Sequence, residues 1–234
     1  MKRLGVAALV LVALAAGGLY WLRGNLDGLV KAAIEKIGSQ MVQAPVTVDA
    51  VDIRPSDGRG VIRGLAIGNP AGFKSRNAMK VAEIDVAIDV RSLTGDVVTV
   101  TRIVIASPAV TYEKAGGMTN FDAIQKNIAA YAGPSKSQEP GKKLIVGEFA
   151  MRGATAQASA DFMPGKTVVV ALPDILLRDV GKNKGGVTPG ELGQTIAAAV
   201  KQRLTGAVSF DRLAKSMTQG VEGAGHAIKG LFGK

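Results

Sequence analysis

The chain has 234 residues, with 29 Lys and Arg against 19 Asp and Glu, which gives a formal net charge of +10. It contains no cysteine and a single histidine, His226. These counts exclude a disulfide scaffold, a thiolate metal site and a cysteine nucleophile, and they leave too few histidines for a histidine-based metal site. Apolar residues make up 47% of the chain, a proportion typical of a folded protein.

The first segment is a candidate membrane anchor. Residues 4–22 carry no charge, and at about 1.5 Å per residue they approach the hydrocarbon thickness of a bilayer. Tyr20 and Trp21 fall at the far end of this run and Arg23 ends it, so these three are candidate membrane-interface residues. A cleaved signal peptide, with a small-residue cleavage site at 13–15, is the alternative interpretation. The uncleaved anchor is favoured because the apolar run continues past that site.

We expect three regions in the chain. Residues 1–23 form a transmembrane signal anchor, residues 24–205 a β-rich domain with an exposed loop at 133–143, and residues 206–234 an amphipathic, Gly-rich tail. The short basic N-terminus favours a cytoplasmic N-terminus. The expected location is therefore the inner membrane, crossed once, with the bulk of the chain in the periplasm.

The first half of the expected domain begins with a helix and continues with strands. Apolar residues recur every three or four positions over 25–41, which predicts an amphipathic helix. A period of two then predicts strands, with a bulge near Arg102 where the apolar phase slips, and Asn120 is the expected cap of a short helix. The expected strands cover residues 46–53, 60–67, 80–90, 97–106 and 108–113.

The second half repeats the pattern and ends in a helix. Four more strands are expected, over 144–152, 154–160, 167–172 and 174–180. Thr188, Pro189 and Glu191 then form a capping-box signature with proline at the first helical position. The predicted fold class is therefore α+β: a curved, mainly antiparallel sheet that packs against amphipathic helices near 26–41 and 189–204.

One set of apolar strand residues is the candidate binding surface. Its members alternate with polar residues on two neighbouring strands, so they share one face of the sheet. They are Ile84, Val86, Ile88, Val98, Val100, Ile103 and Ile105. The pattern does not distinguish an open lipid groove from a closed core.

The sequence contains no recognisable catalytic, cofactor or metal motif, so we expect no enzyme activity and no cofactor. The carboxylates of Glu83, Asp85 and Asp89 alternate on one strand and indicate a solvated face more than a cation site. Aromatic residues make up only 4% of the chain, which argues against nucleic-acid binding. Residues 178–234 hold nine basic and four acidic residues, and this surplus favours anionic lipid headgroups as partners.

Several motifs resemble the AsmA-like family of envelope proteins. Four pieces follow one another in the order of that family's repeat: the strand at 84–93 with its Ser-Leu ending, the strand at 98–105 with alternating Val and Ile, the segment 107–113 and the segment 116–124. Residues 64–73 and 172–181 look like segments of its small single-anchor members. The resemblance covers about residues 45–205, and this chain is much shorter than the large members.

The resemblance implies a non-enzymatic protein, anchored in the inner membrane, that binds or helps transfer lipid in support of outer-membrane assembly. Membrane lipids are the expected partners, with other envelope proteins or a second copy as further candidates. The alternative function is an envelope scaffold or interaction subunit without lipid cargo. The small size of the chain places a continuous lipid path between two membranes in doubt.

Overall fold

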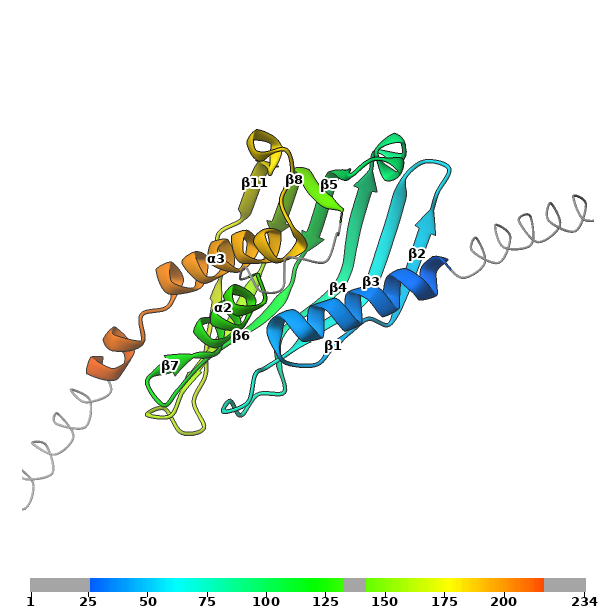
Figure 1. The fold of residues 1–234 in the computed structure, drawn as a ribbon. Coiled ribbons are helices and arrows are strands. Elements are labelled where there is room, and N and C mark those ends of the chain that lie inside the picture. Colours follow the sequence, from blue (N-terminus) through cyan, green and yellow to red (C-terminus); the bar gives the residue numbers. More distant parts are fainter. Residues whose placement is uncertain (1–25, 133–141, 217–234) are drawn as a thin grey trace, which may run out of the picture.

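The computed structural model describes residues 26–132 and 142–216, which form an α+β structure. One eleven-stranded, open sheet is covered on one face by three longer helices (Figure 1). The helices are the first helix (residues 26–42), α2 (Asn120–Tyr131) and α3 (Pro189–Ala207). The strands are β1 (Val46–Thr47), β2 (Ala50–Arg54), β3 (Arg59–Gly68), β4 (Asn77–Ile88), β5 (Val97–Ala106), β6 (Ala109–Ala115), β7 (Met118–Thr119), β8 (Lys143–Arg152), β9 (Thr155–Ala160), β10 (Val168–Ala171) and β11 (Ile175–Val180).

The predicted sheet is confirmed as curved and mainly antiparallel, but it is mixed. Among the described strands eight pairs are antiparallel, whereas β5 with β8 and β6 with β9 are parallel. The parallel pairs arise because the chain crosses over through α2 between β6 and β8. The long β4 pairs with β3 on one side and with both β5 and β6 on the other.

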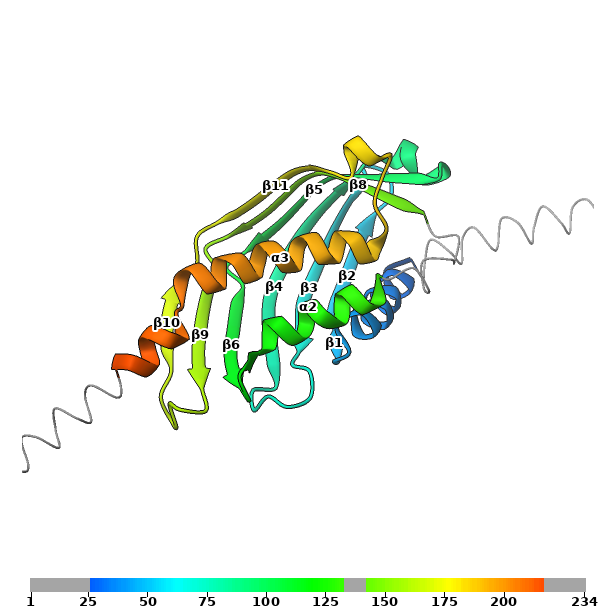
Figure 2. The same ribbon diagram turned by 60° about the vertical axis from the view of Figure 1, so that its left-hand side comes forward.

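The curvature has a local cause, visible in Figure 2. Three chain segments, β5–β6, β8–β9 and β10–β11, all change direction at one level of the sheet. Ser107 and Gly153 have φ of 49° and 62° at two of these bends. Backbone hydrogen bonds keep the neighbouring segments in register at the bends. The N–H of Ser107 donates to the carbonyl oxygen of Arg152 at 2.8 Å, and the N–H of Leu172 donates to the carbonyl oxygen of Ala154 at 2.8 Å.

Side chains of the first helix cover one edge of the sheet. Three of these side chains accept hydrogen bonds from backbone N–H groups of β1, β2 and the segment between them. Without these bonds the N–H groups could pair with another strand. The pairs are Asp27 with Ile53 (2.8 Å), Glu35 with Val48 (2.9 Å) and Ser39 with Val46 (2.9 Å). These residues are eight and four positions apart, so the same helix face presents all three.

Most predicted elements are confirmed, and three details differ. The bulge predicted near Arg102 is among the confirmed features, since Ala87 faces Arg102 but Ile88 faces Val100. The differences concern the end of one strand, the division of another and the start of α2. The strand predicted to reach Val90 ends at Ile88, because Val90–Thr94 forms a 3-10 helix, η1. The expected strand over 46–53 is divided into β1 and β2.

The third difference concerns the start of α2. The cap of α2 is not Asn120 but Thr119, whose side chain accepts the N–H of Asp122 in a capping box. The capping box of α3 at Thr188 and Glu191 is confirmed.

The core continues beyond residue 205, where the domain was expected to end. Val208 and Phe210 are buried with it, and the Phe210 ring lies 5.0 Å from the ring of Tyr112. The membrane anchor predicted for residues 1–23 lies outside the described residues. Within residues 26–132 and 142–216, no helix combines the length and the apolar character needed to cross a bilayer.

Candidate functional site: an apolar cavity beneath the helices

The structure brings six of the seven candidate binding residues together in three cross-strand pairs. Their side chains project from the same face of the sheet, and β8 continues the rows, with Phe149 beside Ile103. The pairs are Ile84 with Ile105, Val86 with Ile103, and Ile88 with Val100. The seventh residue, Val98, lies opposite Leu144 of β8.

These residues divide between a closed core and a more open region. Ile84, Val100 and Ile105 are buried. Val86, Ile88, Val98 and Ile103 keep part of their surface exposed.

A cavity of about 380 Å³ lies between the helices and the sheet. The first helix, α2 and α3 form its roof, and β3, β4, β5 and β8 contribute to its floor. Six residues illustrate its chemistry: Ile34, Ile124, Ile196 and Val200 from the helices, and Ile105 and Phe149 from the sheet. No charged side chain lines it, so the cavity suits an apolar ligand.

A second apolar hollow, of about 230 Å³, lies where the first helix begins. Leu26 and Val30 of that helix line it together with Val86 and Ile88 of β4. Val90 and Leu93 of η1 also line it and are 39% and 44% exposed. Arg54 and Arg59 also line it, and the guanidinium of Arg54 lies 3.9 Å from a carboxylate oxygen of Asp57.

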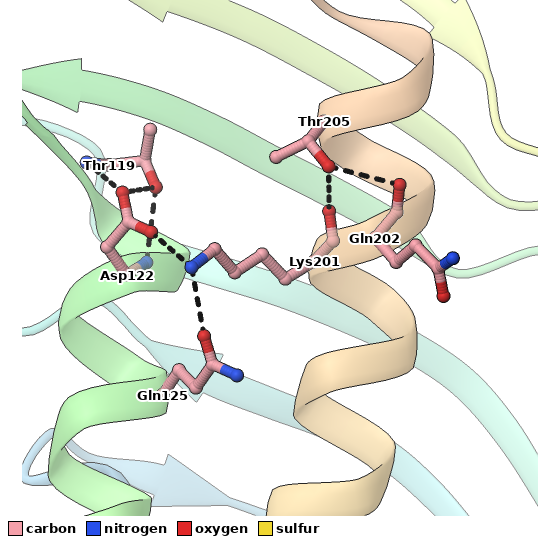
Figure 3. Close-up of polar contacts among 6 residues, drawn as sticks. All are labelled: Thr119, Asp122, Gln125, Lys201, Gln202 and Thr205. Carbon is pink, nitrogen blue, oxygen red and sulfur yellow. Dashed lines mark hydrogen bonds and ion pairs between the residues drawn. The ribbon is translucent and has the colours of Figure 1, made fainter.

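A polar contact holds α2 and α3 together over the larger cavity (Figure 3). The ammonium of Lys201 in α3 lies 2.6 Å from a carboxylate oxygen of Asp122 and donates to Oε1 of Gln125 at 3.0 Å. The other carboxylate oxygen of Asp122 accepts the N–H and the hydroxyl of Thr119. Asp122 therefore caps its own helix and binds α3 at the same time.

The protonation of Asp122 depends on these partners. Partial burial alone would raise the pKa of its carboxyl, but the hydrogen bonds from Lys201 and Thr119 outweigh burial and hold the pKa below its usual value. The carboxylate is therefore ionised at neutral pH. The contact joins two helices whose apolar sides line the cavity.

Three polar residues of the motifs quoted in the sequence analysis, Asn69, Glu113 and Asn120, form a largely buried hydrogen-bond network. Asn120 is fully buried; its side-chain oxygen accepts the N–H of Glu113 at 3.0 Å, and its amide donates to Asn69 at 2.8 Å. The Glu113 carboxylate accepts the N–H groups of Lys74 and Ser75 at 2.6 and 2.9 Å. Burial opposes ionisation of Glu113, but these bonds leave its pKa lowered. The network fixes the loop at 69–76 against β6 and the start of α2.

Two of the three acidic residues at 83–89, Glu83 and Asp89, have structural partners. Arg63 donates to Glu83 at 3.2 Å, and Asp89 caps η1 by accepting the N–H of Arg91. The described residues hold no group of three or more Asp, Glu or His side chains arranged for a metal ion. The membrane-interface candidates Tyr20, Trp21 and Arg23 lie outside the described residues, as does His226.

Three contributors to the site were not predicted from the sequence. Phe149 and Met151 of β8 line the larger cavity, yet they were not among the candidates because nothing in the pattern indicated that β8 lies beside β5. Lys201 was also missed. One signal was available for Lys201, since it directly follows the apolar residue Val200 in the amphipathic helix predicted near 189–204.

Comparisons with known proteins place the chain in no family. No protein-family model matches it, and a search of curated proteins finds no significant match.

Proposed function

We propose that the chain is a non-enzymatic, inner-membrane-anchored periplasmic protein that binds or helps transfer lipid in support of envelope assembly. The observation that carries this proposal is the apolar cavity of about 380 Å³. Ligand pockets commonly measure about 300–1,000 Å³ and are lined mainly by apolar side chains. The resemblance of residues 45–205 to the AsmA-like family supports the same class of ligand.

The position of the second hollow supports delivery of lipid from a bilayer. Leu26 lines this hollow and lies four residues after Leu22, the last residue of the uncharged run in the expected anchor. Four residues span at most about 14 Å even when fully extended. If residues 4–22 cross the membrane, the hollow lies near its surface, where Arg54 and Arg59 would meet lipid phosphates.

Native mass spectrometry of the full chain in a non-ionic detergent tests the proposal. We expect co-purified lipid with the wild-type chain and less of it with Ala197→Phe, because Ala197 lines the cavity and a phenyl ring would fill part of it. Ala198→Phe is the matched control, since its neighbour Ala198 is exposed on the same helix. Absence of lipid from the wild-type chain, or equal lipid in all three proteins, would contradict lipid binding.

The alternative function, an envelope scaffold, is favoured by a different observation. The first helix covers the edge at β1 and β2, whereas β10 and β11 end the sheet on the other side, and no described strand pairs with their outer edge. Val169 of β10 is 64% exposed and Leu176 of β11 is 47% exposed. Such an edge can accept a partner strand. A pull-down in which Val169→Lys loses a partner that Ala197→Phe retains would favour the scaffold.

A further inference from the structure

The solvent-facing side of the sheet carries a hollow of about 430 Å³ that is lined by both polar and apolar residues. Thr155 and Gln157 of β9 line it, and they alternate with the buried Ala154, Ala156 and Ala158. Because successive strand residues point to opposite faces, the hollow lies on the side of the sheet opposite the core. It extends from the start of β4 across β6 and β9 to β10.

Small side chains explain why the sheet is hollowed at this place. Lys80 faces Ala109, Ala109 faces Thr155, and Thr155 faces Ala171, so one cross-strand row beyond Lys80 contains no large side chain. The next row places Gln157 between Thr111 and Val169. Three strand spacings separate β4 from β10, or about 14 Å. The hollow is therefore longer than a single phosphate ion requires.

The two ends of the hollow differ in chemistry. Arg76 and Lys80 lie at the β4 end, and within residues 26–132 and 142–216 their side chains form no ion pair. Thr155 and Gln157 in the middle offer a hydroxyl and an amide with no partner in that part of the chain. No carboxylate lines the hollow.

The nearby charge of Glu113 does not neutralise these cations. Glu113 lies two residues after Thr111 on β6, so it belongs to the same face of that strand. Both of its oxygens accept backbone N–H groups, those of Lys74 and Ser75, and it is 4% exposed. The two cations, Arg76 and Lys80, are exposed, whereas the Glu113 carboxylate is buried and already accepts two hydrogen bonds. The hollow therefore keeps a net positive charge.

We propose that this hollow binds a phosphate ester of a polyol, with the phosphate between Arg76 and Lys80 and the polyol hydroxyls over Thr155 and Gln157. Charge-assisted hydrogen bonds from two cations favour a phosphate over a neutral group. The amide and hydroxyl groups beyond them suit the hydroxyls of a sugar or of glycerol. Such a ligand has two sources, a soluble sugar phosphate or the headgroup of an anionic phospholipid.

Calorimetry on the full chain in a non-ionic detergent tests this site with three soluble probes: glucose 6-phosphate, inorganic phosphate and glucose. We expect glucose 6-phosphate to bind more tightly than phosphate, and glucose not to bind. The double variant Arg76→Gln, Lys80→Gln should weaken glucose 6-phosphate at least about tenfold. The control, Lys36→Gln with Lys126→Gln, removes the same charge from exposed helix positions and should leave the affinity within about twofold.

A second variant and a second ligand complete the test. Gln157→Glu places a carboxylate on the floor of the hollow and should also weaken glucose 6-phosphate binding at least about tenfold, while all variants keep the wild-type melting temperature. Dihexanoyl phosphatidylglycerol, with dihexanoyl phosphatidylcholine as its control, identifies a lipid source if it binds with the same dependence on Arg76 and Lys80. The site is refuted if neither glucose 6-phosphate nor the phosphatidylglycerol binds, or if the control double variant weakens binding as much as Arg76→Gln, Lys80→Gln does.

Discussion

Gly193 of α3 lies so close to Met41 of the first helix that a Cβ atom on Gly193 would be 2.6 Å from the Met41 sulfur. Both residues line the apolar cavity. Gly190, one turn earlier, faces Ala132 instead, and its added Cβ would lie 2.8 Å from the Cβ and 3.1 Å from the Cα of Ala132. The two glycines thus allow α3 to approach two different neighbours, one flexible and one rigid.

We predict opposite effects of alanine at these two positions. Gly193→Ala should raise the free energy of unfolding by about 0.5 kcal/mol, because alanine favours a helix and the flexible Met41 side chain can turn into the cavity. Gly190→Ala should lower the free energy of unfolding by about 1 kcal/mol, because the backbone of Ala132 cannot move aside. Urea unfolding measures both, and effects of the same sign and size would contradict the difference.

Lys201→Met tests the contact between α2 and α3. The variant keeps the length of the side chain but leaves Asp122 and Gln125 without their cationic donor, so we expect the free energy of unfolding to fall by about 1 kcal/mol. The loss stays modest because both partners are about a third exposed. The control is Lys126→Met, an exposed position on α2. A double-mutant cycle with Asp122→Asn should show that the two substitutions do not have additive effects on the free energy of unfolding. Additive effects would mean that Lys201 and Asp122 do not stabilise the fold through this contact.

Acid should destabilise the fold below about pH 4. The pKa of Glu113, Asp122 and Glu191 is lowered in the folded chain; for Glu191 the first cause is the hydrogen bond from the N–H of Thr188. A lowered folded pKa contributes stability above the unfolded pKa of about 4, and this stability is lost as the pH falls through the folded pKa.

Melting temperatures measured between pH 3 and 7 check the acid dependence. Glu113→Gln should lower the melting temperature at pH 7 and flatten its fall on acidification, because the variant cannot gain a proton at this site. Glu83→Gln is the control, since Glu83 is an exposed partner of Arg63. An acid profile of Glu113→Gln identical in slope to wild type would show that Glu113 does not contribute.

Asn120→Ala should be among the most destabilising polar substitutions, at about 2–3 kcal/mol. It leaves the N–H of Glu113, the carbonyl of Thr111 and the side chain of Asn69 without a buried partner. The control, Asn127→Ala, removes one part-buried hydrogen bond to Val42 from the same helix and should cost about 1 kcal/mol. Denaturant unfolding measures both; a smaller effect at Asn120 would argue against a structural role for the motif.

Local sequence patterns predicted most elements because the signals that define them are local. The alternation at Ile84, Val86 and Ile88 requires a strand with one apolar face, and the phase slip at Arg102 requires a bulge, whatever the rest of the chain does. The capping box at Thr188 and Glu191 likewise involves residues three positions apart. The cap of α2 was misplaced by one residue because Thr119 and Asn120 are both good caps, and only the buried partners of Asn120 separate them.

The sequence by itself determined that a sheet with one apolar face and amphipathic helices would form, and that Ile84, Val86 and their neighbours would share that face. Only the tertiary structure decided that β8 lies parallel to β5, that three helices roof a cavity, and that Arg76 and Lys80 border a hollow on the opposite face. These features depend on contacts between residues far apart in the chain, whose partners are chosen by packing and by the bends at Ser107 and Gly153. A period of two defines which face a side chain occupies, but it carries no information about which strand lies next to it.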